Sequence, residues 1–125
     1  MSAPREIRSI AVFCGSNVGN EPVYAQAAAA LGREIARRGV TLVYGGTHKG
    51  LMGALADAFV ALPGGIGTLE EFVEVWTLNQ LGEADKPAGL LDVAGFYQPF
   101  MAFIDSMIER GFLPQAHRTS IAVSP

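Results

Sequence analysis

Three apolar runs, each followed by a glycine-rich loop, constrain the fold of this 125-residue chain most strongly. The runs cover residues 9–14, 40–44 and 59–62, and each loop leads into residues with the spacing or propensity of a helix. Short, nearly continuous apolar runs are typical of strands that are buried on both faces. Strands that alternate with helices form parallel sheets through right-handed crossovers. The pattern therefore predicts an α/β fold with a doubly wound parallel sheet in three layers.

Two more strands and four helices complete the expected pattern. The strands are expected at residues 88–91 and 119–123, and the helices at residues 21–38, 51–58, 69–81 and 97–110. The last helix is expected to bury one apolar face, formed by Phe100, Met101, Phe103, Ile104, Met107 and Ile108. Ligands are expected at the carboxyl ends of the strands, where all three glycine-rich loops lie.

Composition indicates a single domain that spans residues 1–125. Half of the residues are hydrophobic, yet no apolar run approaches the roughly 20 residues of a membrane span, so no membrane association is expected. The formal charge of −3 gives no electrostatic footprint for a nucleic-acid partner. Cys14 is the single cysteine, and residues 1–10 lack the apolar core of a secretion signal, which favours a cytoplasmic protein. Cys14 is expected to be a small buried thiol.

The boundary between residues 51–58 and residues 59–62 breaks the pattern. A helix usually reaches the next strand through roughly 2 to 6 residues, but no turn residue separates these two segments. The expected helix is also barely two turns long, which is short for a crossover. The spacing predicts that an internal segment is missing between Ala58 and Phe59, either from the sequence as given or through a real deletion.

The strongest motif is P-G-G-I-G-T-L-E-E at residues 63–71, between an expected strand and an expected helix. Glycines let consecutive backbone N–H groups turn toward an anion, and a helix start adds unpaired donors and the positive end of its dipole. This arrangement predicts a phosphate cradle without lysine. The motif is neither a Walker loop nor the dinucleotide fingerprint G-x-G-x-x-G. The alternative is a tight turn followed by an ordinary helix cap.

Glu71 has two possible roles. With Thr68 it fits the capping box T-x-x-E, in which the carboxylate only returns to the amide of Thr68. Projected on a helix, however, Leu69, Phe72, Val73 and Trp76 share one face, while Val75 and Leu78 flank Glu71 on the other. A helix that is apolar on two sides needs a second covering surface, such as a partner subunit. Glu71 would then lie between two buried surfaces as a functional carboxylate.

The first two loops carry weaker candidates. Ser16 and neighbouring amides could contact a ligand at the same sheet edge, or could form a plain turn. The second loop contains His48 and Lys49, for which a solvated loop is the alternative. His48 and His117 are far apart in the sequence and have no second ligand at metal-binding spacing, so no metal is expected.

The chain resembles the LONELY GUY (LOG) family of cytokinin-activating phosphoribohydrolases, whose bacterial members were long labelled possible lysine decarboxylases. The resemblance rests on the motif at residues 63–71 and its continuation E-V-W-T at residues 74–77. Upstream, V-F-C-G-S at residues 12–16, L-V-Y-G-G at 42–46 and G-L-M-G at 50–53 also match. The likeness covers nearly the whole chain.

This resemblance implies a Rossmann-like homodimer that hydrolyses the N-glycosidic bond of a nucleoside 5′-monophosphate. The products are a free base, such as a cytokinin, and ribose 5-phosphate, and no cofactor is needed. It places the catalytic carboxylate on Glu71. The substrate and phosphate contacts that it implies are Gly64, Gly65, Gly67, Thr68, Glu70, Thr77, Ser16 and Gly46.

The chain departs from the family pattern at the same junction that the spacing singles out. Family members carry a segment there that ends in M-x-x-R-K, whose arginine is catalytic, and nothing between Ala58 and Phe59 supplies it. A nucleotide-binding module without catalysis is therefore the alternative function. A decarboxylase would need a lysine to hold pyridoxal phosphate, and neither Lys49 nor Lys86 has a supporting context.

Overall fold

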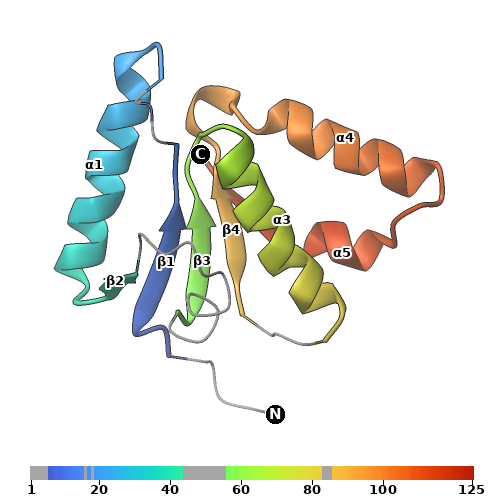
Figure 1. Ribbon diagram of the computed structural model, residues 1–125, viewed down its shortest axis with the longest axis horizontal. Coiled ribbons are helices and arrows are strands. Elements are labelled where there is room, and N and C mark those ends of the chain that lie inside the picture. The colour runs from blue at the N-terminus through green and yellow to red at the C-terminus, as the bar shows by residue number, and fades with distance from the viewer. Residues whose placement is uncertain (1–5, 16, 18, 44–55, 83–85) are drawn as a thin grey trace.

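Five parallel strands form one sheet in the order β2-β1-β3-β4-β5. The computed structural model describes residues 6–15, 17, 19–43, 56–82 and 86–125. Within them the strands are β1 (Ser9–Phe13), β2 (Thr41–Val43), β3 (Ala58–Ala61), β4 (Ala88–Leu91) and β5 (Ile121–Ser124). Because every pairing is parallel, all carboxyl ends lie at one edge of the sheet, at the top of Figure 1.

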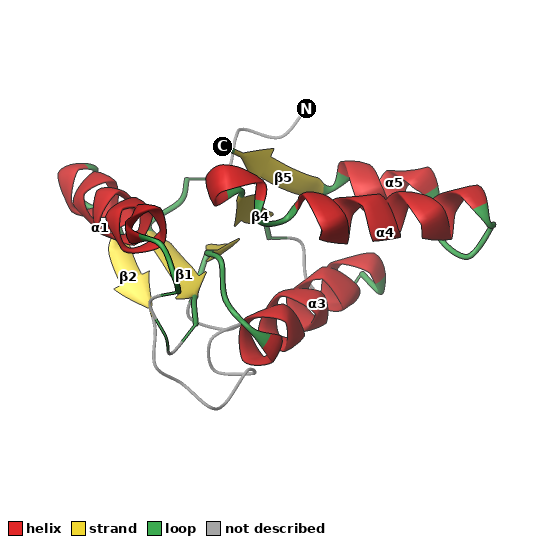
Figure 2. Cartoon of the chain, turned by 90° about the horizontal axis from the view of Figure 1, so that it is seen from above, coloured by secondary structure: helices red, strands yellow, loops and turns green. Residues whose placement is uncertain are grey.

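Helices cover both faces of this sheet. They are α1 (Pro22–Arg37), α3 (Ile66–Gln80), the 3₁₀ turn η1 (Val93–Gly95), α4 (Gln98–Glu109) and α5 (Gln115–Thr119). Figure 2 shows α1 and α3 on opposite sides of the sheet, and α3 packs on β1, β3 and β4. The expected α/β fold, a Rossmann-like parallel sheet in three layers, is confirmed. None of the helices in the described ranges is long and apolar enough to cross a membrane.

The hydrophobic core lies between α3, α4 and one face of the sheet. Alternate residues of the strands face it, which is why β1 has a buried–intermediate–buried pattern. The core residues are Ala11, Phe13, Ala56, Phe59, Ala61, Phe72, Trp76, Ala88, Leu90, Tyr97, Met101, Ile104 and Ile121. Trp76 Nε1–H also donates to the carbonyl oxygen of His117 at 3.0 Å, which joins α3 to α5. This packing fixes the start of α3 relative to the carboxyl edge of the sheet.

Several expected elements differ in detail from the structure. The expected helix at residues 51–58 does not reach Ala58, which is the first residue of β3, and residues 51–55 lie outside the described ranges. The expected last strand begins at Ile121, because Thr119 closes α5. Phe103 was expected in the core but is 61% exposed, since Met101 and Ile104 form the buried line of α4.

A carboxylate joins the amino ends of β1 and β3. One Asp57 oxygen, Oδ2, accepts hydrogen bonds from the backbone N–H groups of Arg8 at 2.9 Å and Ser9 at 3.1 Å. In return, the Asp57 N–H donates to the Ser9 hydroxyl at 3.1 Å. These donors, led by the Arg8 amide, lower the pKa of Asp57 below its ordinary value of 3.8. The ionised carboxylate therefore stabilises the native pairing of the two strands.

Acidification is expected to weaken this link. Because the folded state lowers the Asp57 pKa, its stabilising contribution is present above about pH 4 and is lost as the pH falls through the lowered value. The Asp57→Asn variant should be less stable than the wild type at pH 7, and its Tm should fall less steeply between about pH 5 and pH 2. Thermal denaturation across this pH range measures both effects. Parallel curves for the two proteins would contradict the role given to Asp57.

Candidate active site

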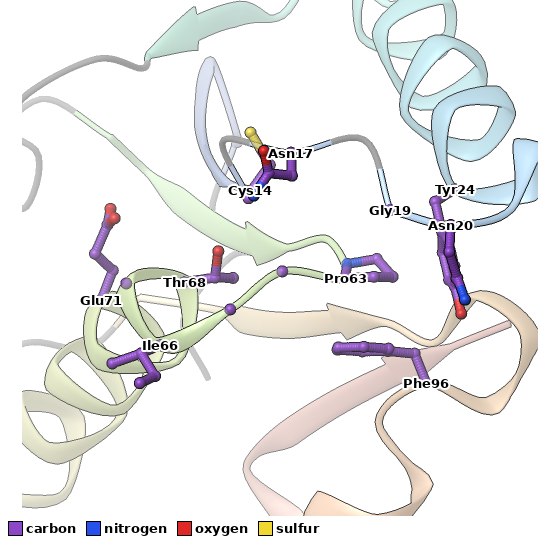
Figure 3. A pocket seen from close by; sticks show the side chains of 14 residues that line it. Cys14, Asn17, Gly19, Asn20, Tyr24, Pro63, Ile66, Thr68, Glu71 and Phe96 are labelled. Carbon is purple, nitrogen blue, oxygen red and sulfur yellow. The ribbon is translucent and has the colours of Figure 1, made fainter.

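A pocket of about 490 Å³ opens at the carboxyl edge of the sheet. The loops after β1, β3 and β4 and the first turns of α1 and α3 form its walls (Figure 3). The described residues that line it are Cys14, Gly15, Asn17, Gly19, Asn20, Tyr24, Pro63, Gly64, Gly65, Ile66, Gly67, Thr68, Glu71 and Phe96. Its volume lies within the range of small-molecule sites, roughly 300 to 1,000 Å³. The pocket is therefore the candidate ligand site of this fold.

The loop after β3 approaches the loop after β1 very closely. A Cβ built on Gly64 would lie 2.8 Å from the backbone nitrogen of Gly15 and would overlap the hydroxyl of Thr68. A Cβ on Gly15 would lie 3.2 Å from the Cα of Gly64. Only glycine at position 64 lets the two loops meet in this way. The closeness brings backbone groups from both loops to one side of the pocket.

The first turn of α3 points at the pocket and leaves Thr68 without a partner. The helix begins at Ile66, with Gly65 as its N-cap and no side-chain capping bond. Thr68 is thus the third helical residue, 3% exposed, and its Oγ1 has no hydrogen-bond partner among the described residues. The Thr68 half of the capping box that the sequence allowed does not form, because Thr68 is not the N-cap and its Oγ1 has no hydrogen-bond partner in the described part of the chain. A buried hydroxyl beside the amides of a helix start can donate a hydrogen bond to an anion.

Glu71 also lines this pocket, and it is half-buried one turn into α3. It is the only charged residue among the described residues of the lining. Figure 3 places its carboxylate at the end of the pocket beyond Thr68, away from Phe96. The structure therefore brings together the cradle predicted at Gly64, Gly65, Gly67 and Thr68 and the predicted catalytic carboxylate.

Of the other residues predicted for the site, the two that the structure describes, Glu70 and Thr77, are not among the lining residues. Glu70 is exposed on α3. Thr77 is also exposed, and its hydroxyl donates to the carbonyl oxygen of Val73 at 2.7 Å. Ser16 and Gly46 lie outside the described residues. Their roles stay predictions that rest on the family resemblance.

Three lining residues were missed or misjudged in the sequence. Cys14 was expected to be buried, but it is exposed, because β1 ends at Phe13 and the chain turns into the pocket wall. Tyr24 and Phe96 come from α1 and from the loop before α4, and their ring centroids lie 6.1 Å apart. No local pattern marks these two rings, since only the topology brings them together.

The loop that carries Phe96 is held by several bonds. Asp92 Oδ1 accepts the backbone N–H of Tyr97 at 2.7 Å, and Ala94 has a left-handed φ of 52°. The buried Tyr97 hydroxyl donates to the carbonyl oxygen of Leu62 at 2.6 Å, immediately before the cradle. Burial raises the pKa of Tyr97 to about 12. The same tyrosine therefore anchors both the aromatic loop and the strand end that leads to the cradle.

Removing the Tyr97 hydroxyl should destabilise the protein without creating a cavity in the core. In Tyr97→Phe the ring stays, but the Leu62 carbonyl loses its donor in a buried place, which costs about 1 to 2 kcal/mol. Urea denaturation should show a lower midpoint with an unchanged slope. A variant as stable as the wild type would show that this hydrogen bond contributes nothing to the fold.

Lys86, the lysine within the described residues, lies at the amino edge of the sheet, opposite the pocket. Lys86 precedes β4, and its Nζ donates to the carbonyl oxygen of Ala56 at 2.7 Å. Parallel strands place this amino edge far from the pocket at the carboxyl ends. A pyridoxal phosphate enzyme needs a lysine in the site to hold the cofactor. The described part of the pocket does not fit that cofactor.

Fold and pocket together define a Rossmann-like α/β protein with a pocket at a topological switch point of its sheet, between β1 and β3. The family model described as "Possible lysine decarboxylase" matches residues 10–125. The chain is 38% identical over 166 residues to cytokinin riboside 5'-monophosphate phosphoribohydrolase LOG of Oryza sativa subsp. japonica, with 94% of this chain and 69% of the relative covered. It is 36% identical over 173 residues to cytokinin riboside 5'-monophosphate phosphoribohydrolase LOG1 of Arabidopsis thaliana, with 100% and 81% covered. The chain therefore belongs to the LOG family.

The matches with these relatives are longer than this chain. The match with the Arabidopsis relative spans 173 residues, whereas this chain has 125, so 48 positions in that stretch have no counterpart here.

Proposed function

We propose that this protein hydrolyses the N-glycosidic bond of nucleoside 5′-monophosphates and releases a free base and ribose 5-phosphate. The observation that carries the proposal is the presence of Glu71 and the Thr68 cradle in one pocket. The names of the relatives describe phosphoribohydrolases that act on cytokinin riboside 5'-monophosphates, which supports this reaction and a role in cytokinin biosynthesis.

The residues of the pocket suit the charges of this reaction. Backbone amides at the start of α3 and the Thr68 hydroxyl would hold the 5′-phosphate, with no cation required from a side chain. Cleavage of the glycosidic bond leaves an oxocarbenium-like ribose, and a carboxylate stabilises this cation and orients the attacking water. Glu71 performs this role in the proposal. The fixed phosphate holds the ribose against it and removes most of its freedom.

The outer side of α3 supports assembly as a homodimer. Ile66 is 85% exposed and Leu69 is 40% exposed, although both side chains are large and apolar. Leu69 had been expected to share a face with Phe72 and Trp76. Those two are buried as expected, together with Thr68, whereas Leu69 lies outside the buried face. A second copy of the chain would cover this apolar surface beside the pocket. A cytoplasmic location fits the proposed substrate and the single free thiol, Cys14.

A binding module without catalysis is the second candidate, and one observation favours it. The 48 positions that lack a counterpart are numerous enough to include the family segment with the catalytic arginine. We place this gap before Ala56 rather than at Ala58–Phe59, because Ala58 already pairs with Ile10 and Asp57 is bonded to Ser9. The helix-to-strand junction without turn residues, which the sequence analysis places at Ala58–Phe59, would then lie upstream of β3.

Incubation of the purified protein with AMP separates the two candidates. The hydrolase releases adenine and ribose 5-phosphate in equal amounts, which chromatography detects. The binding module raises its Tm with AMP but leaves the nucleotide intact. If AMP neither stabilises the protein nor is cleaved, both candidates fail.

A further inference from the structure

The end of the pocket opposite Glu71 is aromatic. Tyr24 and Phe96 meet edge to face, with an interplanar angle of 77°, and Pro63 lies between them and the cradle (Figure 3). Phe96 is 40% exposed although it is a large apolar ring. Besides the hydroxyl of Tyr24, the polar side chain labelled at this end is the uncharged Asn20 (Figure 3). This end therefore offers a planar, apolar surface rather than a second anion site.

The two rings are held before any ligand arrives. Phe96 follows two left-handed residues, Ala94 at φ 52° and Gly95 at φ 73°, and the left-handed conformation is costly for alanine. Strain of this kind persists only where the surroundings impose it, and here Asp92 and Tyr97 provide the bonds. Tyr24 is confined by Gly19, since a Cβ there would lie 2.8 Å from its ring.

A nucleoside monophosphate does not reach these rings in the proposed reaction. Its phosphate would occupy the cradle and its ribose would extend toward Glu71. Because the bond that is cleaved joins the ribose to the base, the base would also lie on the Glu71 side. The phosphate carries a single ester bond. In this pose, the space between the cradle and Phe96 would face the phosphate oxygens that bear no substituent.

We infer that Tyr24, Pro63 and Phe96 form a second subsite, which takes an aromatic or apolar group joined to the phosphate through a second ester or anhydride bond. The ligand class is a phosphodiester or diphosphate ester of a nucleoside. This inference rests on the phosphate position in the proposed function. Stacking of a planar group on a protein ring should strengthen binding about tenfold.

Two esters of AMP test the subsite, and calorimetry measures their binding. Adenosine 5′-(phenyl phosphate) and adenosine 5′-(methyl phosphate) carry the same charge and differ only in the group that would reach the rings. The wild type should bind the phenyl ester about tenfold more tightly than the methyl ester. In Phe96→Ala this ratio should fall to about one, and Phe96→Leu, which keeps apolar volume without a ring, should lie between.

Controls separate this inference from the proposed function. Phe103→Ala removes a 61% exposed phenylalanine that does not line the pocket, and it should keep the wild-type ratio. Thermal denaturation of Phe96→Ala should show a single cooperative transition, which shows that the variant is folded. Equal binding of the two esters by the wild type, or a phenyl preference that survives in Phe96→Ala, would overturn the subsite alone. Failure of AMP itself to bind would overturn the proposed function and the subsite with it.

Discussion

Replacement of Glu71 by glutamine should lower kcat for AMP hydrolysis by about a thousandfold, because the amide cannot stabilise the ribosyl cation. Glutamine keeps the shape of the side chain, and the phosphate contacts lie on other groups. The KM for AMP should therefore stay within about threefold of the wild type. Initial rates of adenine release over a range of AMP concentrations measure both constants.

A matched variant controls for the loss of a surface carboxylate. Glu109→Gln makes the same change on the exposed end of α4, outside the pocket, and should retain wild-type kcat. If Glu71→Gln also keeps its kcat, Glu71 is not the catalytic group. If it loses AMP binding instead of turnover, its carboxylate serves the ground-state complex only.

Gly64→Ala should destabilise the protein and abolish its response to AMP. The added methyl group would overlap Thr68 and press on the backbone of Gly15, so the two loops would have to separate. Overpacking of this kind costs about 2 to 3 kcal/mol, equivalent to a fall in Tm of about 8 to 12 °C for a chain of this size. Thermal denaturation with and without AMP tests both parts.

Substitution of the nearby Gly67 by alanine should have the opposite effect on stability. Its Cβ would meet nothing within 4 Å, and it lies inside α3. Gly67→Ala should therefore raise the stability of the free protein by up to about 1 kcal/mol through helix propensity. If Gly64→Ala and Gly67→Ala lowered the Tm by similar amounts, the close approach at Gly64 would not explain the loss of stability.

The sequence predicts the strands of the sheet well but their burial only in part. β1 and β3 are largely buried as expected. The edge strand β2 was also expected to be buried, but Thr41 and Leu42 are exposed because a described strand pairs with β2 on one side only. Runs such as 9–14 have few polar residues, which predicts their burial, and their alternation with helices predicts the parallel pairing. The short helix α5 was missed since its five residues, Q-A-H-R-T, have no apolar periodicity. Its position depends on the bond from Trp76 to His117, a contact between residues far apart in the chain.

The sequence also predicts only part of the candidate site. The cradle and Glu71 are contiguous in the sequence, so a local motif predicts them together. The sequence could not decide between a capping box and a ligand role for Thr68, because that choice depends on where α3 begins. A start at Ile66 places Thr68 inside the helix with an unpartnered hydroxyl. The aromatic end depends on Tyr24 and Phe96, which only the completed sheet brings together.

The measurement that tests the account most directly compares adenine release from AMP with release from adenosine. Phosphate-anchored cleavage predicts that AMP yields adenine and ribose 5-phosphate, while adenosine reacts at least about a hundredfold more slowly because nothing holds its ribose at Glu71. Equal rates for the two substrates, or the release of inorganic phosphate and adenosine from AMP, would contradict it.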